Sequence, residues 1–158
     1  MSHPWEEIRL VDAIAPTVLG SSLTGTYVSL KNVNKAYIMV HLCQASTDII
    51  TIYPYQATAI AGTGAKVFSL GLPCWLSNGC SSDETLTKQT TGVNFSFSSS
   101  TGDKIAIIEV QPGQMDLANS FDCINIRTSA GTTDSLISAV YYLDMRYQEA
   151  DTPTVFAD

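Results

Sequence analysis

The chain has 158 residues, of which 45% are hydrophobic and only 15% are charged, and its formal net charge is −7. This length fits one domain with an ordinary hydrophobic core, and the low charge beside many Ser, Thr, Gly and Asn residues is typical of an all-β protein with uncharged loops. The negative charge argues against nucleic acid or an anionic membrane as a partner, because both would repel the protein.

The N-terminal residues 1–20 are predicted to form an arm that leads into the body of the domain. They contain one strand pattern, Ile8–Ile14, followed by a Gly/Ser-rich link. The first residues lack the basic and apolar regions of an export signal, and no stretch of about 20 apolar residues follows, so we expect a soluble, non-exported protein. Trp5 is expected either to pack on its own domain or to dock on a neighbour.

The strongest strand patterns lie at 36–44 and 49–58, after a short predicted strand at 26–30. Because only the polar residues 45–48 separate the two long patterns, we predict that they form an antiparallel hairpin, with the short strand beside it. Pro54 cannot donate a ladder hydrogen bond, which predicts a sheet edge or a bulge at that residue.

Residues 61–92 are mostly loop-like in composition. The Gly62 and Gly64 turn is followed by a predicted strand at 66–70, and a second short strand is expected at 85–90. Cys74 and Cys80 flank a turn that a disulfide would close in an oxidising environment, although free thiols are the favoured interpretation. The acidic pair at 83–84 is interpreted as a solvated loop rather than a calcium site.

The remaining body alternates clearly between apolar and polar residues. Val93, Phe95 and Phe97 are predicted to face the core, and the strand at 93–98 should pair with the one at 104–110 in a second hairpin. A helical turn is expected within 115–120, then strands at 121–128 and 135–143. Eight or nine such strands predict an antiparallel β-sandwich or barrel over residues 21–147, followed by an exposed tail at 148–158.

No residues with a catalytic, cofactor-binding or metal-binding pattern are found. There is no Gly-x-Ser-x-Gly elbow and no Cys-x-x-Cys spacing. Of the two histidines, His3 lies in the terminus and His41 is interpreted as a packed or interface residue. Cys43 and Cys123 are predicted to be buried thiols. We therefore expect a protein that is not an enzyme and that has no cofactor.

Four segments resemble a family of small tailed-bacteriophage structural proteins that accompany the major capsid protein. They are residues 28–32, 52–66, 121–126 and 139–148. The resemblance implies a virion head protein that decorates and cements the capsid surface, with a jelly-roll-like sandwich fold. It further implies production in the host cytoplasm, the major capsid protein as partner, and assembly into homotrimers.

The expected function is therefore stabilisation of a capsid by binding its outer surface. Two alternatives stay open, a carbohydrate-binding β-sandwich module and a phage tail or connector protein. In the carbohydrate alternative, Tyr53, Tyr55 and Trp75 would form a stacking platform. The candidate interface residues are large and aromatic: Trp5, Tyr53, Tyr55, Trp75 and Phe156.

Overall fold

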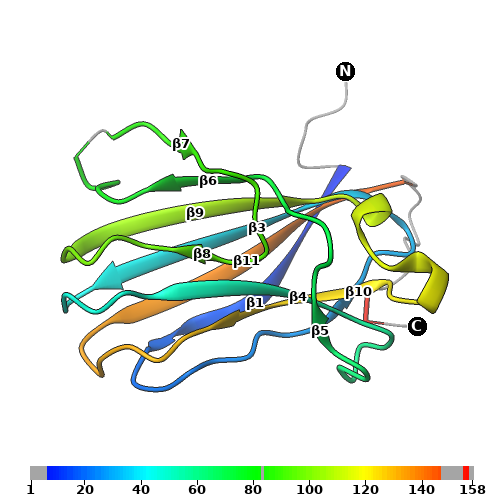
Figure 1. Ribbon diagram of the computed structural model, residues 1–158, viewed down its shortest axis with the longest axis horizontal. Helices are drawn as coiled ribbons and strands as arrows, with labels where there is room; N and C mark the ends of the chain where they lie inside the picture. Colours follow the sequence, from blue (N-terminus) through cyan, green and yellow to red (C-terminus); the bar gives the residue numbers. More distant parts are fainter. Residues whose placement is uncertain (1–6, 83, 147–154, 157–158) are drawn as a thin grey trace.

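The structure is a computed structural model that describes residues 7–82, 84–146 and 155–156. Within this part, two antiparallel sheets pack face to face (Figure 1). The larger sheet has the order β1 (Ile8–Val18), β11 (Leu136–Met145), β3 (Val33–Gln44), β9 (Gly102–Val110), β6 (Cys74–Ser77) and β7 (Thr87–Lys88). The smaller sheet has the order β2 (Val28–Ser29), β10 (Cys123–Thr128), β4 (Thr51–Ala57) and β5 (Lys66–Val67), with β8 (Phe95–Ser96) also paired to β4.

The strand pairs are nested like those of a long hairpin wrapped over itself. β1 pairs with β11, β2 with β10, β3 with β9 and β4 with β8, so each successive pair joins strands that are closer together in the sequence. Lateral pairing of β11 with β3 and of β10 with β4 then closes the two sheets. This is the connectivity of a jelly roll, so the predicted all-β, jelly-roll-like sandwich is confirmed. The strands β6 and β7 extend the larger sheet beyond β9.

The core lies between the two sheets and is built by alternation along each strand. On β3, for example, Ala36, Ile38, Val40 and Leu42 are all fully buried, while the residues between them face outward. Phe95 and Phe97 are buried as predicted, whereas Val93 is only partly buried. Each sheet therefore has one face in the core and one face toward solvent.

Both predicted hairpins are wrong, although all four strands exist in whole or in part. β3 lies in the larger sheet and β4 in the smaller one, and β8 and β9 are likewise in different sheets. Residues 45–50 cross from one sheet to the other, a distance of about 10 Å. Period-two alternation identifies which residues of a strand face the core. The alternation is the same whether the next strand pairs with the first in one sheet or packs against it from the other sheet. Sequence alone could not separate these cases.

Pro54 is accommodated within a paired strand. Its partner on β10 is Ile126, and on the other side of β4 the pairing with β8 ends at Ile52 while that with β5 begins at Tyr55. Pro54 thus falls in a gap where no ladder bond is needed. The predicted strand at 26–30 is only β2, and it pairs with β10 rather than with the predicted hairpin.

The predicted division into arm, body and tail changes at both ends. β1 is a full strand of the larger sheet, paired with β11 from Ile8 to Val18, so residues 8–18 belong to the body. In the predicted tail, Val155 is 3% exposed and its carbonyl accepts a hydrogen bond of 2.7 Å from Ser29 N, while Phe156 is 47% exposed. Trp5 and residues 147–154 lie outside the described residues.

Tyr141 joins the two sheets through the core. It is fully buried on β11, and its hydroxyl donates to Thr26 O at 2.8 Å and accepts from Ile126 N at 3.2 Å. Both partners belong to the smaller sheet or to the segment that leads into it. Because buried polar groups need partners, this side chain fixes the position of one sheet on the other.

Lys104 joins the end of β3 to the loop between β8 and β9 at one end of the sandwich. Its side chain is fully buried, and Nζ donates to Gln44 Oε1 at 2.9 Å and to the carbonyls of Ser98 and Ser100, both at 2.5 Å. All these acceptors are neutral. Burial lowers the pKa of Lys104 because the ammonium loses water without gaining a carboxylate.

Candidate interaction surfaces

The outer face of the larger sheet carries a transverse row of apolar side chains. Val140, Met39, Ile107 and Trp75 are successive cross-strand partners on β11, β3, β9 and β6, and we call them the apolar row. All four are partly exposed. Charged partners stand at its two ends, Asp12 on β1 and Lys88 on β7, and Lys88 Nζ lies 5.7 Å from the Trp75 ring centroid.

Residues on both sides of the apolar row extend the same surface. Tyr142 and Tyr37 pair on one side. On the other side a shallow hollow of about 270 Å³ is lined by Pro16, His41, Cys43, Leu136, Ile137 and Ser138. His41 is exposed there, so it is not a packed residue, and its interpretation as an interface residue stays a prediction. The outer face of the larger sheet is thus apolar along the row, with tyrosines and the Lys35–Glu109 ion pair on one side and the shallow hollow on the other.

The outer face of the smaller sheet is different, with tyrosines grouped around an arginine. Arg127 lies opposite Tyr53, and Asn125 lies opposite Tyr55. The Arg127 guanidinium carbon stands 4.0 Å from the Tyr55 ring centroid, and Nη2 donates to the Tyr27 hydroxyl at 2.8 Å. We call Tyr27, Tyr53, Tyr55, Asn125 and Arg127 the tyrosine–arginine site. A cation over an aromatic face is attracted by the ring quadrupole, so the guanidinium is held in place.

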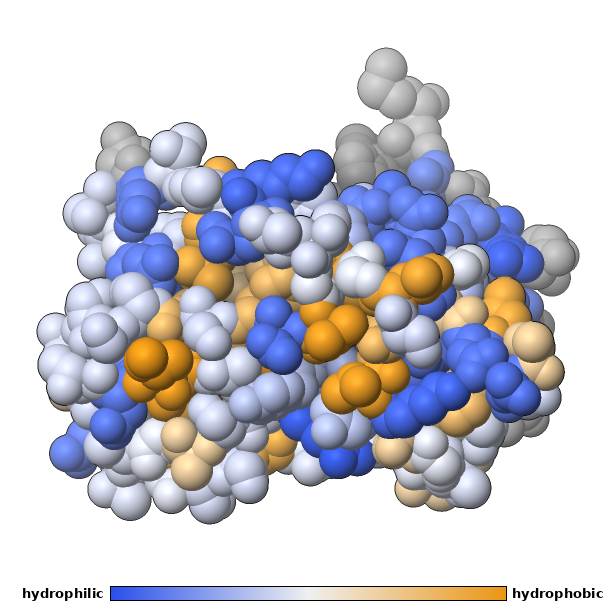
Figure 2. All heavy atoms as spheres, viewed as in Figure 1, coloured by the Kyte–Doolittle hydropathy of each residue, from blue (hydrophilic) through white to orange (hydrophobic). Residues whose placement is uncertain are grey.

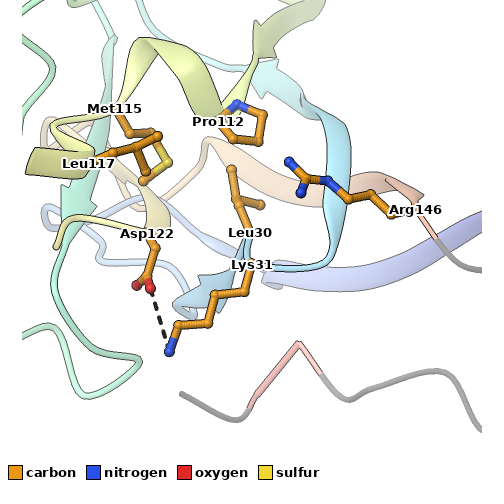
Figure 3. A pocket seen from close by; sticks show the side chains of 7 residues that line it. All are labelled: Leu30, Lys31, Pro112, Met115, Leu117, Asp122 and Arg146. Atoms are coloured by element: carbon orange, nitrogen blue, oxygen red, sulfur yellow. Dashed lines mark ion pairs between the residues drawn. The ribbon is translucent and has the colours of Figure 1, made fainter.

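A pocket of about 190 Å³ opens at one end of the sandwich, and we call it the end pocket (Figure 3). Leu30, Pro112, Met115 and Leu117 form an apolar wall, and Arg146 stands at the rim. The other charged side chains at the rim neutralise each other, because Lys31 Nζ lies 3.5 Å from Asp122 Oδ2. The pocket therefore suits a small apolar group.

The wall of the end pocket is fixed by an ion pair behind it. Asp116, between Met115 and Leu117, contacts Lys66 Nζ at 2.5 Å, and its backbone N donates to Gln56 Oε1 at 2.9 Å. The hydrogen bond from Lys66 lowers the pKa of the Asp116 carboxyl. The turns η1 (Pro112–Gln114) and η2 (Leu117–Asn119), within or beside the predicted helical turn, are thereby attached to β4 and β5.

The residues that the structure describes contain no cluster of metal-binding side chains. No group of three or more His, Cys, Asp and Glu side chains within this part is arranged to hold a metal ion. Burial raises the pKa of Cys74 to about 12, contact with Asp103 raises that of Cys43, and burial raises that of Cys80. These thiols are protonated at neutral pH and are weak nucleophiles.

The four cysteines form no disulfide within the described residues, and the geometry excludes a bond between Cys74 and Cys80. Cys74 lies opposite Ile108, whereas Cys80 N donates to Asp103 O. These partners on β9 are 108 − 103 = 5 residues apart, which is about 16 Å along a strand. A disulfide needs Cα atoms within about 7 Å. Cys123 is buried as predicted, but Cys43 is exposed, so that prediction is wrong.

The structure places the predicted interface residues on different surfaces. Tyr53 and Tyr55 face outward on β4, whereas Trp75 belongs to the apolar row on the other sheet. The three-ring stacking platform is therefore not formed. Sequence reasoning missed Met39, Ile107 and Arg127. For Met39 the signal was present, because the run at 36–40 is apolar at consecutive positions and so predicts two apolar faces.

Large hydrophobic side chains elsewhere on the surface are scattered. In the view of Figure 2, hydrophobic residues form separate spots among polar ones. Leu70 and Leu117, which are 58% and 54% exposed, come from different parts of the fold, whereas Leu10, which is 55% exposed, lies beside Tyr142 on the outer face of the larger sheet. Single exposed apolar residues are normal, so the apolar row differs from them by its continuity.

The described residues contain no helix long and apolar enough to cross a membrane.

Comparisons with known proteins give weak similarities. No family model matches the chain, and the search of curated proteins finds no match. The SPBc2 prophage-derived protein YomS is 10% identical, with a TM-score of 0.45, over 85% of this chain and 92% of its own. A CBM4 structure is 9% identical, with a TM-score of 0.32, over 78% and 57%. The infectious bursal disease virus Gt strain structure is 9% identical, with a TM-score of 0.22, over 93% and 43%.

Proposed function

We propose that this protein is a non-enzymatic virion structural protein that binds the outer surface of a phage capsid and stabilises it. The observation that carries the proposal is the apolar row across the larger sheet. The resemblance of four sequence segments to tailed-phage head proteins supplies the class of partner. The docking face is the outer face of the larger sheet, and the major capsid protein covers it.

The apolar row has the composition of an interface centre. Met and Trp are enriched in such centres and charged residues are depleted there, and here Asp12 and Lys88 stand only at the ends of the row. Burial of apolar surface contributes about 25 cal/mol per Å² before the ordering costs are subtracted. Because a capsid repeats its surface, copies that also bind one another gain avidity, and we propose homotrimers for this reason.

A pair of charge insertions tests the docking face. Ile107→Asp places a carboxylate in the apolar row, and Thr51→Asp places one at a similarly exposed outward position on the smaller sheet. Labelled variants are incubated with particles that have been stripped of this protein, and retention after dilution is measured. Ile107→Asp should reduce retention at least about tenfold, because a buried unpaired charge is costly. Thr51→Asp should bind like the unmodified protein.

Two results would contradict the proposal. Equal retention of both variants would exclude the larger sheet as the docking face. Failure of the unmodified protein to bind stripped particles would exclude the capsid as the partner. Light scattering of the free protein tests the trimer separately. A stable monomer at all concentrations, together with isolated copies on the particle, would exclude it.

A further inference from the structure

The tyrosine–arginine site contains an arginine without an acidic partner. Among the described residues, the ion pairs involve Lys31, Lys35 and Lys66, and none involves Arg127. The chain has 15 acidic residues against 8 basic ones, so a carboxylate would be the expected neighbour of an arginine. Arg127 is instead held by two tyrosines, through the ring of Tyr55 and the hydroxyl of Tyr27.

The unpaired polar atoms of the interior are concentrated at the same place. Within the described part of the chain, the buried side-chain nitrogen and oxygen atoms without a hydrogen-bond partner are Asn125 Oδ1 and Arg127 Nε. Asn125 is fully buried and its Nδ2 donates to Gly25 O at 3.3 Å. A buried polar group without a partner destabilises the folded state. Two unpaired buried atoms on neighbouring residues are unusual in a folded protein, and they distinguish this part of β10 from the rest of the described interior.

The donors that remain free at this site match a carboxylate. Arg127 Nη2 is used by Tyr27, but Nη1 forms no hydrogen bond with the described residues. The Tyr27 hydroxyl accepts from Arg127, so its own proton is free to be donated. Arginine recognises carboxylates through paired N–H donors in a fixed plane. The turn that holds Gly62 packs on the Tyr27 ring, since a Cβ at Gly62 would lie 2.8 Å from Tyr27 Cε2, and it fixes that donor.

The surroundings of the site suit a hydroxylated ring better than an apolar side chain. Next to Tyr53 on β4, Thr51 Oγ1 shares a hydrogen bond of 2.8 Å with Ser96 Oγ, and Thr51 N binds Ser129 Oγ at 2.9 Å. The guanidinium covers one face of Tyr55, which leaves Tyr53 as the ring available for stacking. Aromatic rings with a polar tip bind ligands that have both an apolar face and hydroxyl groups.

We propose that the tyrosine–arginine site binds a hexuronate, an acidic sugar unit of a polysaccharide. The sugar carboxylate binds Arg127 Nη1 and the Tyr27 hydroxyl, and the C–H face of the pyranose stacks on Tyr53. This site lies on the opposite side of the sandwich from the apolar row. Sugar binding therefore does not depend on capsid docking, and either activity can fail without the other.

Titrations followed by the Arg127 Nε–Hε signal in NMR test the proposal. This buried, unpaired N–H reports directly on the guanidinium. D-Glucuronate should shift the signal with a saturating curve, and D-glucose, which lacks the carboxylate, should bind at least about tenfold more weakly. Arg127→Gln should abolish the shifts of neighbouring amides, and Tyr27→Phe should weaken binding. Lys88→Gln removes the corresponding cation over an aromatic ring on the other sheet and should change nothing.

Three outcomes would overturn the proposal. The first is the absence of a glucuronate-dependent shift in the unmodified protein, a result that does not depend on whether any variant folds. The second is equal binding of glucuronate and glucose, which would exclude a role for the carboxylate. The third is equal binding of acetate or of a glutamate-containing peptide, which would assign the site to a bare carboxylate and not to a sugar.

Discussion

The outer faces of the two sheets are built on the same interior but present different chemistry. The larger sheet exposes Met39 and Ile107 in an apolar row, whereas the smaller sheet exposes Tyr53 and Arg127 among hydroxyl groups. The inward faces are alike, because both are lined by buried aliphatic side chains. The function of a jelly roll thus depends on the outward-facing residues of its strands, because these residues can vary without changing the fold.

The largest expected effect comes from a change in the interior that both faces share. Phe97 is 1% exposed, so Phe97→Ala should lower the free energy of unfolding by about 3 to 5 kcal/mol. Leu136→Ala, at a residue that is 51% exposed, is the matched control and should cost less than about 1 kcal/mol. Urea unfolding measures both. A loss below about 1 kcal/mol for Phe97→Ala would mean that the interior is misassigned.

The second largest effect on stability is expected from the Tyr141 hydroxyl, which connects the two sheets. Tyr141→Phe removes the hydroxyl that binds Thr26 O and Ile126 N, which should lower the free energy of unfolding by about 1 to 3 kcal/mol because the buried Ile126 N and the partly buried Thr26 O lose a partner. Since Thr26 precedes Tyr27, the tyrosine–arginine site should be disturbed more than the apolar row. Tyr142→Phe, at the outward neighbour, should be nearly neutral. Equal effects of the two substitutions would show that the hydroxyl bonds do not hold the sheets together.

A pH series tests the burial of the Lys104 ammonium group at one end of the sandwich. The folded-state pKa of Lys104 lies below 10.5, the unperturbed value, so between the lowered pKa and 10.5 the unfolded chain binds more protons than the folded one. The free energy of unfolding should therefore rise with pH through this window. Lys104→Met removes the contribution, and its curve should rise less than that of the unmodified protein. Parallel curves would show that the ammonium is not desolvated.

The smallest effect is expected at the edge of the apolar row. Lys88→Ala removes the cation 5.7 Å from the Trp75 ring, and because the residue is exposed the free energy of unfolding should change by less than about 0.5 kcal/mol. The fluorescence of Trp75 should nevertheless change, since its ring loses a charged neighbour. Trp75 can be isolated for this measurement by Trp5→Phe. An unchanged spectrum would show that Lys88 does not interact with the Trp75 ring.

The sequence predicted the layers of this molecule better than the contacts between strands. Alternation at Phe95 and Phe97 located a buried face correctly, and the fold class followed from the number of such segments. Whether β3 and β4 lie beside or opposite each other depends on where residues 45–50 lead, and alternation is the same in both cases. The tyrosine–arginine site joins Tyr27 and Arg127, 100 residues apart, so no local pattern could reveal it.

Electron microscopy of the intact particle tests the central claim most directly. With this protein resolved on the capsid, the account predicts that the outer face of the larger sheet contacts the shell, with Met39, Ile107 and Trp75 covered by the major capsid protein. The tyrosine–arginine site should face away from the shell. A map in which the apolar row faces solvent, or in which the protein lies in the tail or connector, would contradict the account.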